Sequence, residues 1–199
     1  MVLNIFISAF IIIFLLNLIP VFGPPTWTVL SFISFVYPIS SLPLFIFVAL
    51  CASTSGRLVL TLSSKYILRN HLLGEKYRLN MDYLKKHLEK RPHYASLLFF
   101  IEAFTPLPSD QFFIAYGLTG MKLRYALVPF FVARIFTYSF WVYTASAVSK
   151  TILTRSFDIL SFLTWPFIIG ELVVLFLVYL FVKVDWRHFV SNHKFKILR

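Results

Sequence analysis

An apolar stretch from Phe99 to Tyr116 contains two prolines and two carboxylates in its middle, which limits how the chain can fold. Pro106 and Pro108 lack the backbone N–H that a continuous α-helix needs. Glu102 and Asp110 are costly inside a bilayer. Non-helical backbone at membrane depth survives only where protein covers it or where it lines a wet cavity. The stretch is therefore predicted to form a re-entrant hairpin over a polar site.

The composition indicates that this hairpin belongs to an all-α polytopic membrane protein. Of the 199 residues, 59% are hydrophobic and 14% are charged, against about 25% charged in soluble domains. The net charge is +11, but the basic residues flank the apolar runs, where they orient the chain and meet anionic headgroups; nucleic-acid binding is not expected. The lone Cys51 and five scattered histidines predict no disulfide, metal site or cofactor.

Apolar runs and prolines together predict about four full transmembrane helices and two opposed re-entrant hairpins in a single domain, 1–199. The start has no basic flank and no small-residue cleavage site, so residues 3–19 are expected to be a retained span. The predicted order is a span, a first hairpin and a span in 1–62, a basic cytoplasmic loop in 63–92, the second hairpin in 93–121, two spans in 122–183 and a basic tail in 184–199.

The basic loop has a short apolar stripe of Met81, Leu84 and Leu88 at helical spacing. This stripe predicts an amphipathic helix on the membrane face, and a solvated connector is the alternative. If both termini are cytoplasmic, the loop, the turn with Lys122 and Arg124 and the tail all lie on the cytoplasmic side, as the positive-inside rule requires.

The two predicted hairpins mirror each other along the chain. Each has a proline-rich break and a short apolar arm, and each is followed by a span with one arginine, Arg57 in the first half and Arg134 in the second. One hairpin enters from outside and the other from inside. This pattern is typical of inverted-repeat transporters, whose site lies near the middle of the membrane.

Arg57, Glu102, Asp110 and Arg134 are the ionisable residues around which a site can form. They can be two salt bridges that only tie the hairpins to the spans. They can also form a site in which the arginines bind a phosphate headgroup and the acids balance charge or carry protons, because a low-dielectric site raises a carboxylate's proton affinity. Glu171, in the last span, is either a protonated packing residue or part of the same path.

The run Glu102-x3-Pro106-x-Pro108-x-Asp110, together with Gly56-Arg57, Ala115-Tyr116-Gly117 and Arg134, resembles the DedA family, also called the VTT or SNARE-associated Golgi protein family. The likeness covers about residues 17–147. It implies two re-entrant hairpins that face each other between tilted spans. It also implies lipid transport: bacterial members are linked to polyprenyl-phosphate recycling, and eukaryotic relatives to phospholipid scrambling. The residues then expected to shape the hairpins are Pro24, Pro25, Pro106, Pro108 and Gly117.

The expected function is a flippase- or scramblase-like lipid transporter in the plasma membrane of a prokaryote, with Arg57 and Arg134 on the headgroup and Glu102 and Asp110 for charge balance. Its partners are membrane lipids, and a homo-oligomer is left open. The alternatives are a proton- or ion-coupled transporter of small solutes and a membrane assembly protein without transport. No Gly-x-Ser-x-Gly or His-Glu-x-x-His motif is present, so no catalytic residue is expected.

Overall fold

The computed structural model describes residues 2–20, 23–105, 109–151, 165–192 and 197. These residues are almost all helical, which confirms the all-α prediction, and the only β-type contact among them is an isolated bridge between Val184 and Ile197. The helices are α1 (Val2–Leu18), α2 (Thr26–Val36), α3 (Leu42–Ser63), the π-helical segment η1 (Ser64–Leu72), α4 (Glu75–Leu88), α5 (Pro92–Glu102), α6 (Ser109–Thr119), α7 (Arg124–Thr151), α8 (Trp165–Lys183) and α9 (Trp186–Asn192).

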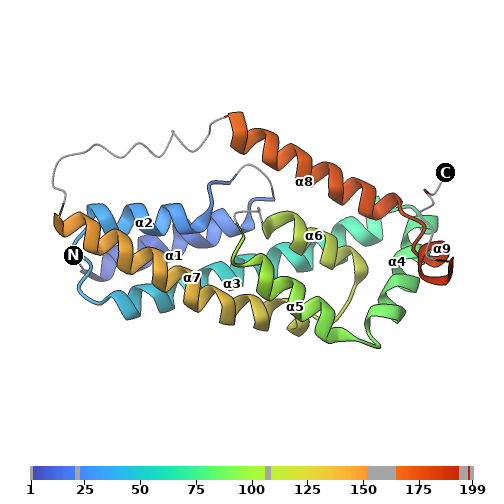
Figure 1. The fold of residues 1–199 in the computed structure, drawn as a ribbon, viewed down its shortest axis with the longest axis horizontal. Coiled ribbons are helices and arrows are strands. Elements are labelled where there is room, and N and C mark those ends of the chain that lie inside the picture. The colour runs from blue at the N-terminus through green and yellow to red at the C-terminus, as the bar shows by residue number, and fades with distance from the viewer. Residues whose placement is uncertain (1, 21–22, 106–108, 152–164, 193–196, 198–199) are drawn as a thin grey trace.

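Two helices of the described chain are long and apolar enough to cross a membrane, Leu42–His71 and Arg124–Ser149. The first joins α3 to η1, so the predicted span over 42–62 continues into the segment that was expected to be a loop. Its 30 residues correspond to about 45 Å at 1.5 Å per residue. The second is α7. These two helices form the long axis of the bundle in Figure 1.

The shorter helices form two hairpins that enter the bundle from opposite ends (Figure 1). In the first, α1 runs from one end to near the middle and α2 returns; in the second, α5 and α6 do the same from the other end. The arms of a hairpin pack on different long helices. Helix α1 packs mainly on α3, and α6 packs on α3 and η1 and also on α8, whereas α2 and α5 pack mainly on α7. Each long helix therefore packs against one arm of each hairpin.

Helix α1 is one arm of the first hairpin, at the position where a full span over 3–19 is expected from the sequence. It has 17 residues, is about 26 Å long and ends near the middle of the bundle (Figure 1). Prolines follow it, and Pro25 is the N-cap of α2, so the chain turns back. Helix α1 begins at the end of the bundle opposite α9 (Figure 1), and the cytoplasmic placement of both termini stays a prediction.

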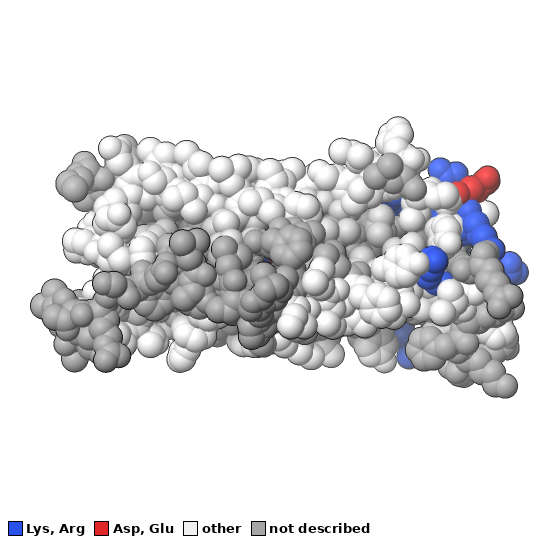
Figure 2. Space-filling model, turned by 90° about the horizontal axis from the view of Figure 1, so that it is seen from above, with Lys and Arg blue, Asp and Glu red and all other residues white. Residues whose placement is uncertain are grey.

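Lysines and arginines gather at one end of the molecule (Figure 2). We call this the basic end; it comprises the basic residues of α4, of the turns at 89–91 and 122–124, and of α9. The apolar stripe of α4 does not face the membrane there, because Met81 and Leu84 are buried and α4 packs on α6 and α9. Asn80 also joins α4 to α9: its side chain donates to the Val184 carbonyl at 2.7 Å and accepts from the Trp186 N–H at 2.9 Å.

Two glycines let the hairpins approach the long helix formed by α3 and η1. A Cβ at Gly56 would lie 2.7 Å from the Phe14 carbonyl of α1. A Cβ at Gly117 would lie 2.7 Å from the Thr61 carbonyl and 2.7 Å from the Ser64 Cβ. Both glycines therefore serve close packing. Gly117 lies in the last turn of α6, at the end away from the tip, so it does not shape the bend of the second hairpin as the sequence had predicted.

Two apolar clusters fill the bundle, one toward each end. The cluster of the first hairpin includes Phe45 and Ala49 of α3 and Tyr138 of α7. The cluster of the second includes Leu60 of α3 and Phe130 of α7. Along α3 and along α7 a buried arginine lies between the residues of the two clusters. The charged residues therefore occupy the level at which the hairpin tips meet.

Candidate functional site

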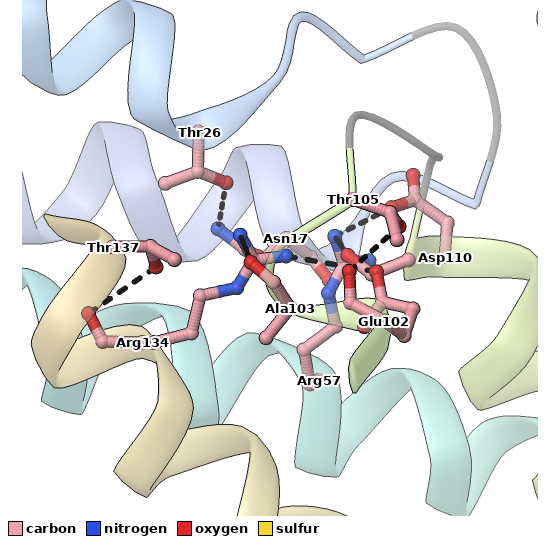
Figure 3. Close-up of polar contacts among 10 residues, drawn as sticks. Asn17, Thr26, Arg57, Glu102, Ala103, Thr105, Asp110, Arg134 and Thr137 are labelled. Carbon is pink, nitrogen blue, oxygen red and sulfur yellow. Dashed lines mark hydrogen bonds and ion pairs between the residues drawn. The ribbon is translucent and has the colours of Figure 1, made fainter. Parts of the chain in front are cut away.

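Five buried polar side chains come together between the hairpin tips and the long helices (Figure 3). They are Asn17 in the last turn of α1, Glu102 at the end of α5, Asp110 in the first turn of α6, Arg57 on α3 and Arg134 on α7. We call them the polar layer. Arg57 is 15 residues after Leu42 and 14 before His71, the ends of its long helix, so the layer lies about halfway along that helix.

Arg57 and Asp110 form a tight ion pair, with Nη2 and Oδ1 separated by 2.5 Å and side-chain exposures of 5% and 8%. Arg57 Nη2 also donates to the Ser109 hydroxyl at 2.8 Å, and Nη1 donates to the Asn17 carbonyl at 3.5 Å. This guanidinium therefore connects α3 to the tips of both hairpins. Removing one partner of such a pair leaves an uncompensated buried charge, at a cost of about 3–5 kcal/mol.

Arg134 and Glu102 are paired more loosely. Arg134 Nη2 lies 3.7 Å from Glu102 Oε1, although both side chains are less than a tenth exposed. Arg134 Nη1 donates to the Ala103 carbonyl at 3.3 Å. Among the described residues, neither carboxylate oxygen of Glu102 accepts a hydrogen bond and Arg134 Nε donates none. A buried carboxylate and a buried guanidinium thus keep hydrogen-bonding capacity for a further group.

Aromatic rings flank both guanidinium groups. The Arg134 guanidinium carbon is 4.9 Å from the Phe130 ring centre and 5.7 Å from that of Tyr138, and the Arg57 carbon is 5.8 Å from the Phe113 ring. Such contacts are worth about 0.5–2 kcal/mol for a cation over a ring. The rings come from the two apolar clusters, so the layer is closed by aromatic walls on both sides.

Asn17 belongs to the polar layer although the sequence analysis did not select it. Its amide donates to the Ile13 carbonyl at 2.8 Å and to the Thr26 hydroxyl at 3.0 Å, which joins α1 to α2 across the first tip. Its Oδ1 has no hydrogen-bond partner among the described residues. The available signal was one amide in an apolar run, three residues before Pro20.

The structure brings together all four charged residues that the sequence had selected. Pro24 and Pro25 lie at the first tip, directly before α2, and Pro25 is the N-cap of that helix. Pro106 and Pro108 lie outside the described residues. Glu171 is on α8, and its side chain is outside the description as well.

No family model, no curated protein and no solved structure matches this chain. The function therefore has to be inferred from the polar layer and its surroundings.

Proposed function

We propose that the protein is a multi-pass membrane protein of the DedA type that moves phosphate-bearing lipid headgroups across the bilayer. The lipid is a polyprenyl phosphate or a phospholipid. The supporting observation is the loose pair of Arg134 and Glu102, buried where the two hairpin tips meet and with unused hydrogen-bonding atoms on both partners. A headgroup needs such polar contacts halfway across a bilayer, because lipid tails offer none.

The proposed orientation places the basic end in the cytoplasm of a prokaryote. Lys and Arg concentrate in cytoplasmic loops, and Figure 2 shows them at one end of the bundle. The start of α1 then lies on the outer side. The second hairpin enters from the cytoplasm and the first from outside, which is the opposed arrangement that inverted-repeat transporters use.

The two arginines have different roles in this proposal. Arg57 is held by Asp110 and Ser109 at 2.5 and 2.8 Å, so it anchors the second tip to α3. Arg134 has only long contacts, at 3.3 and 3.7 Å. A phosphate oxygen can replace them with shorter, charge-assisted hydrogen bonds to the planar guanidinium. Arg134 is therefore the headgroup-binding residue.

Charge balance links headgroup entry to proton uptake. The polar layer holds two arginines and two acids, so its formal charges cancel when all four are ionised. A phosphate diester adds one negative charge to a buried site, which costs several kcal/mol if nothing compensates it. Glu102 has no hydrogen-bond donor among the described residues, so it is the acid that takes up a proton when the headgroup binds Arg134.

A headgroup-translocation assay in reconstituted liposomes tests this proposal. Wild type should move a fluorescent phospholipid or a polyprenyl phosphate faster than protein-free vesicles do. Arg134→Ala should lower the rate about 10- to 100-fold, the factor for losing one charge-assisted hydrogen bond of about 1.5–3 kcal/mol. Arg78→Ala removes a cation from α4 and serves as the matched control. Equal rates in wild type and Arg134→Ala would show that Arg134 does not bind the headgroup. No movement in wild type would rule out lipid transport.

A proton-coupled transporter of small solutes is the second candidate. Glu102 favours it, because its two oxygens accept no hydrogen bond from the described residues and can bind a proton or a cation without any lipid. Proton flux and headgroup movement measured in the same vesicles separate the two functions. Flux without headgroup movement, abolished by Glu102→Gln, would favour the solute transporter.

A further inference from the structure

An open groove of about 410 Å³ lies between α5 and α7, outside the polar layer. Its lining includes Ser96 and Phe100 of α5 and Arg124, Val128, Pro129 and Val132 of α7. The volume is within the range of about 300–1,000 Å³ that small-molecule sites occupy. Nothing in the proposed function uses this groove, and its chemistry differs from that of the polar layer.

The one backbone carbonyl that Pro129 leaves without a helical partner is hydrogen-bonded to a side chain of the groove wall. Pro129 lies inside α7 and has no N–H, so the Tyr125 carbonyl one turn earlier lacks its helical partner. The Ser96 hydroxyl of α5 donates to that carbonyl at 3.0 Å. The Ser96 hydroxyl and the Tyr125 carbonyl thus satisfy each other. Away from Arg124, what remains for an occupant is the apolar surface of Phe100, Val128 and Val132.

The side chain of Arg124 lies at the basic end of this groove. The Arg124 guanidinium lies over the Tyr125 ring at 4.9 Å and donates to its hydroxyl at 2.9 Å. The ion pairs of the described residues involve three other arginines, and Arg124 is exposed. A phosphate can therefore approach Arg124 without displacing an acid.

The groove extends along the outer face of α5 and α7 from the basic end to about the level of the polar layer. On α7 the lining runs from Arg124 to Val132, two residues before Arg134; on α5 it runs from Ser96 to Phe100, two residues before Glu102. The outer rim is apolar and exposed, with Val128 at 60% exposure. A lipid in the surrounding bilayer would reach the groove sideways, with its headgroup at the level of the basic residues.

We propose that this groove binds a single phospholipid from the cytoplasmic leaflet, with one acyl chain along Phe100 and Val128 and its phosphate on Arg124. The site rests on the proposed lipid transport and adds to it the position from which the headgroup enters. The occupant is a lipid and not free phosphate, because most of the groove is apolar and only its mouth is charged.

Photo-cross-linking tests the groove directly. Benzoylphenylalanine replaces Phe100 in the groove or, as the matched control, Phe176 on the exposed face of α8. The protein is reconstituted in phosphatidylcholine vesicles with phosphatidic acid as a minor component. Mass spectrometry of the adducts should show phosphatidic acid enriched at position 100 over position 176. Arg124→Gln should reduce that enrichment about fivefold, as expected for about 1 kcal/mol per arginine at a charged membrane surface. Equal enrichment at both positions, or enrichment unchanged by Arg124→Gln, would overturn the site.

Translocation measured on groove variants separates this inference from the proposed function. Val132→Trp fills the groove, and Val173→Trp makes the same change on the exposed face of α8. Slower movement in Val132→Trp alone supports the groove as the entry position. If wild type moves headgroups and neither the cross-link nor Val132→Trp shows an effect, the groove fails and lipid transport stands. If the cross-link is enriched but wild type moves nothing, the lipid site stands and transport fails.

Discussion

Asn17 and Glu102 occupy corresponding positions at the two hairpin tips. Each lies in the last turn of the arm that leads into a tip, α1 or α5, and each is buried in the polar layer. The packing follows the same correspondence, because α1 packs on α3 as α5 packs on α7. The two halves thus share one architecture but differ in charge. The first tip carries an amide where the second carries a carboxylate.

The Asn17 amide should stabilise the first tip through its bond to Thr26. Asn17→Ala removes that bond and the one to Ile13, and we expect a loss of about 1–3 kcal/mol for the buried groups left unpaired. Thermal unfolding of the purified protein in detergent measures the loss. In a Thr26→Ala background the cost of Asn17→Ala should fall by about 0.5–1.5 kcal/mol. Additive effects of the two changes would contradict the coupling.

The two acids should respond differently to neutralisation. Asp110→Asn breaks a 2.5 Å ion pair and leaves the Arg57 charge buried, so we expect a loss of about 3–5 kcal/mol. Glu102→Gln removes a carboxylate that accepts no hydrogen bond from the described residues, and its cost should be well below that of Asp110→Asn. Unfolding of the two variants side by side gives the comparison. Equal losses would show that the pairs are equivalent.

Both packing glycines should reject a methyl group. Gly56→Ala and Gly117→Ala place a Cβ 2.7 Å from backbone oxygens, and overpacking of this kind costs about 1–3 kcal/mol. Gly74→Ala is the control, because its Cβ would lie 3.8 Å from a Tyr77 ring carbon, an ordinary contact, and its φ of −58° suits alanine. We expect lower melting temperatures for the first two variants and an unchanged melting temperature for Gly74→Ala. A wild-type melting temperature for Gly56→Ala or Gly117→Ala would argue against the close approach.

The Ser96 hydroxyl should matter only while Pro129 is present. Ser96→Ala leaves the Tyr125 carbonyl without its bond, at an expected cost of about 1 kcal/mol. Pro129→Ala supplies an N–H that can bond the same carbonyl within α7. The cost of Ser96→Ala should therefore shrink in the Pro129→Ala background, as a double-mutant cycle of unfolding would show. An unchanged cost would mean that the hydroxyl has another role.

Charge was the strongest signal in the sequence. Arg57, Glu102, Asp110 and Arg134 stood out because an ionised side chain in an apolar run is costly unless it is paired. Asn17 and Ser109 did not stand out, since a neutral polar group costs less to bury and is common in apolar helices. Which arginine meets which acid also depends on packing between distant helices, and spacing along the chain does not encode it.

The number of crossings was harder to predict than the site. Residues 3–19 are apolar enough to suit either a span or a hairpin arm, and their short length is the only hint. Charge parity, which counts these residues as a crossing, placed the start of the chain on the cytoplasmic side, whereas the orientation proposed above places it outside. The extension of α3 into η1 was missed for a related reason: Lys65 and Arg69 made a helical segment resemble a loop.

Helices α3 and α7 each pack against one arm of each hairpin, so both hairpins connect the same two long helices. A sliding or tilting of one long helix against the other would spread the arms of both hairpins together. A movement at one hairpin tip would then be accompanied by a movement at the other, so the two tips are mechanically coupled.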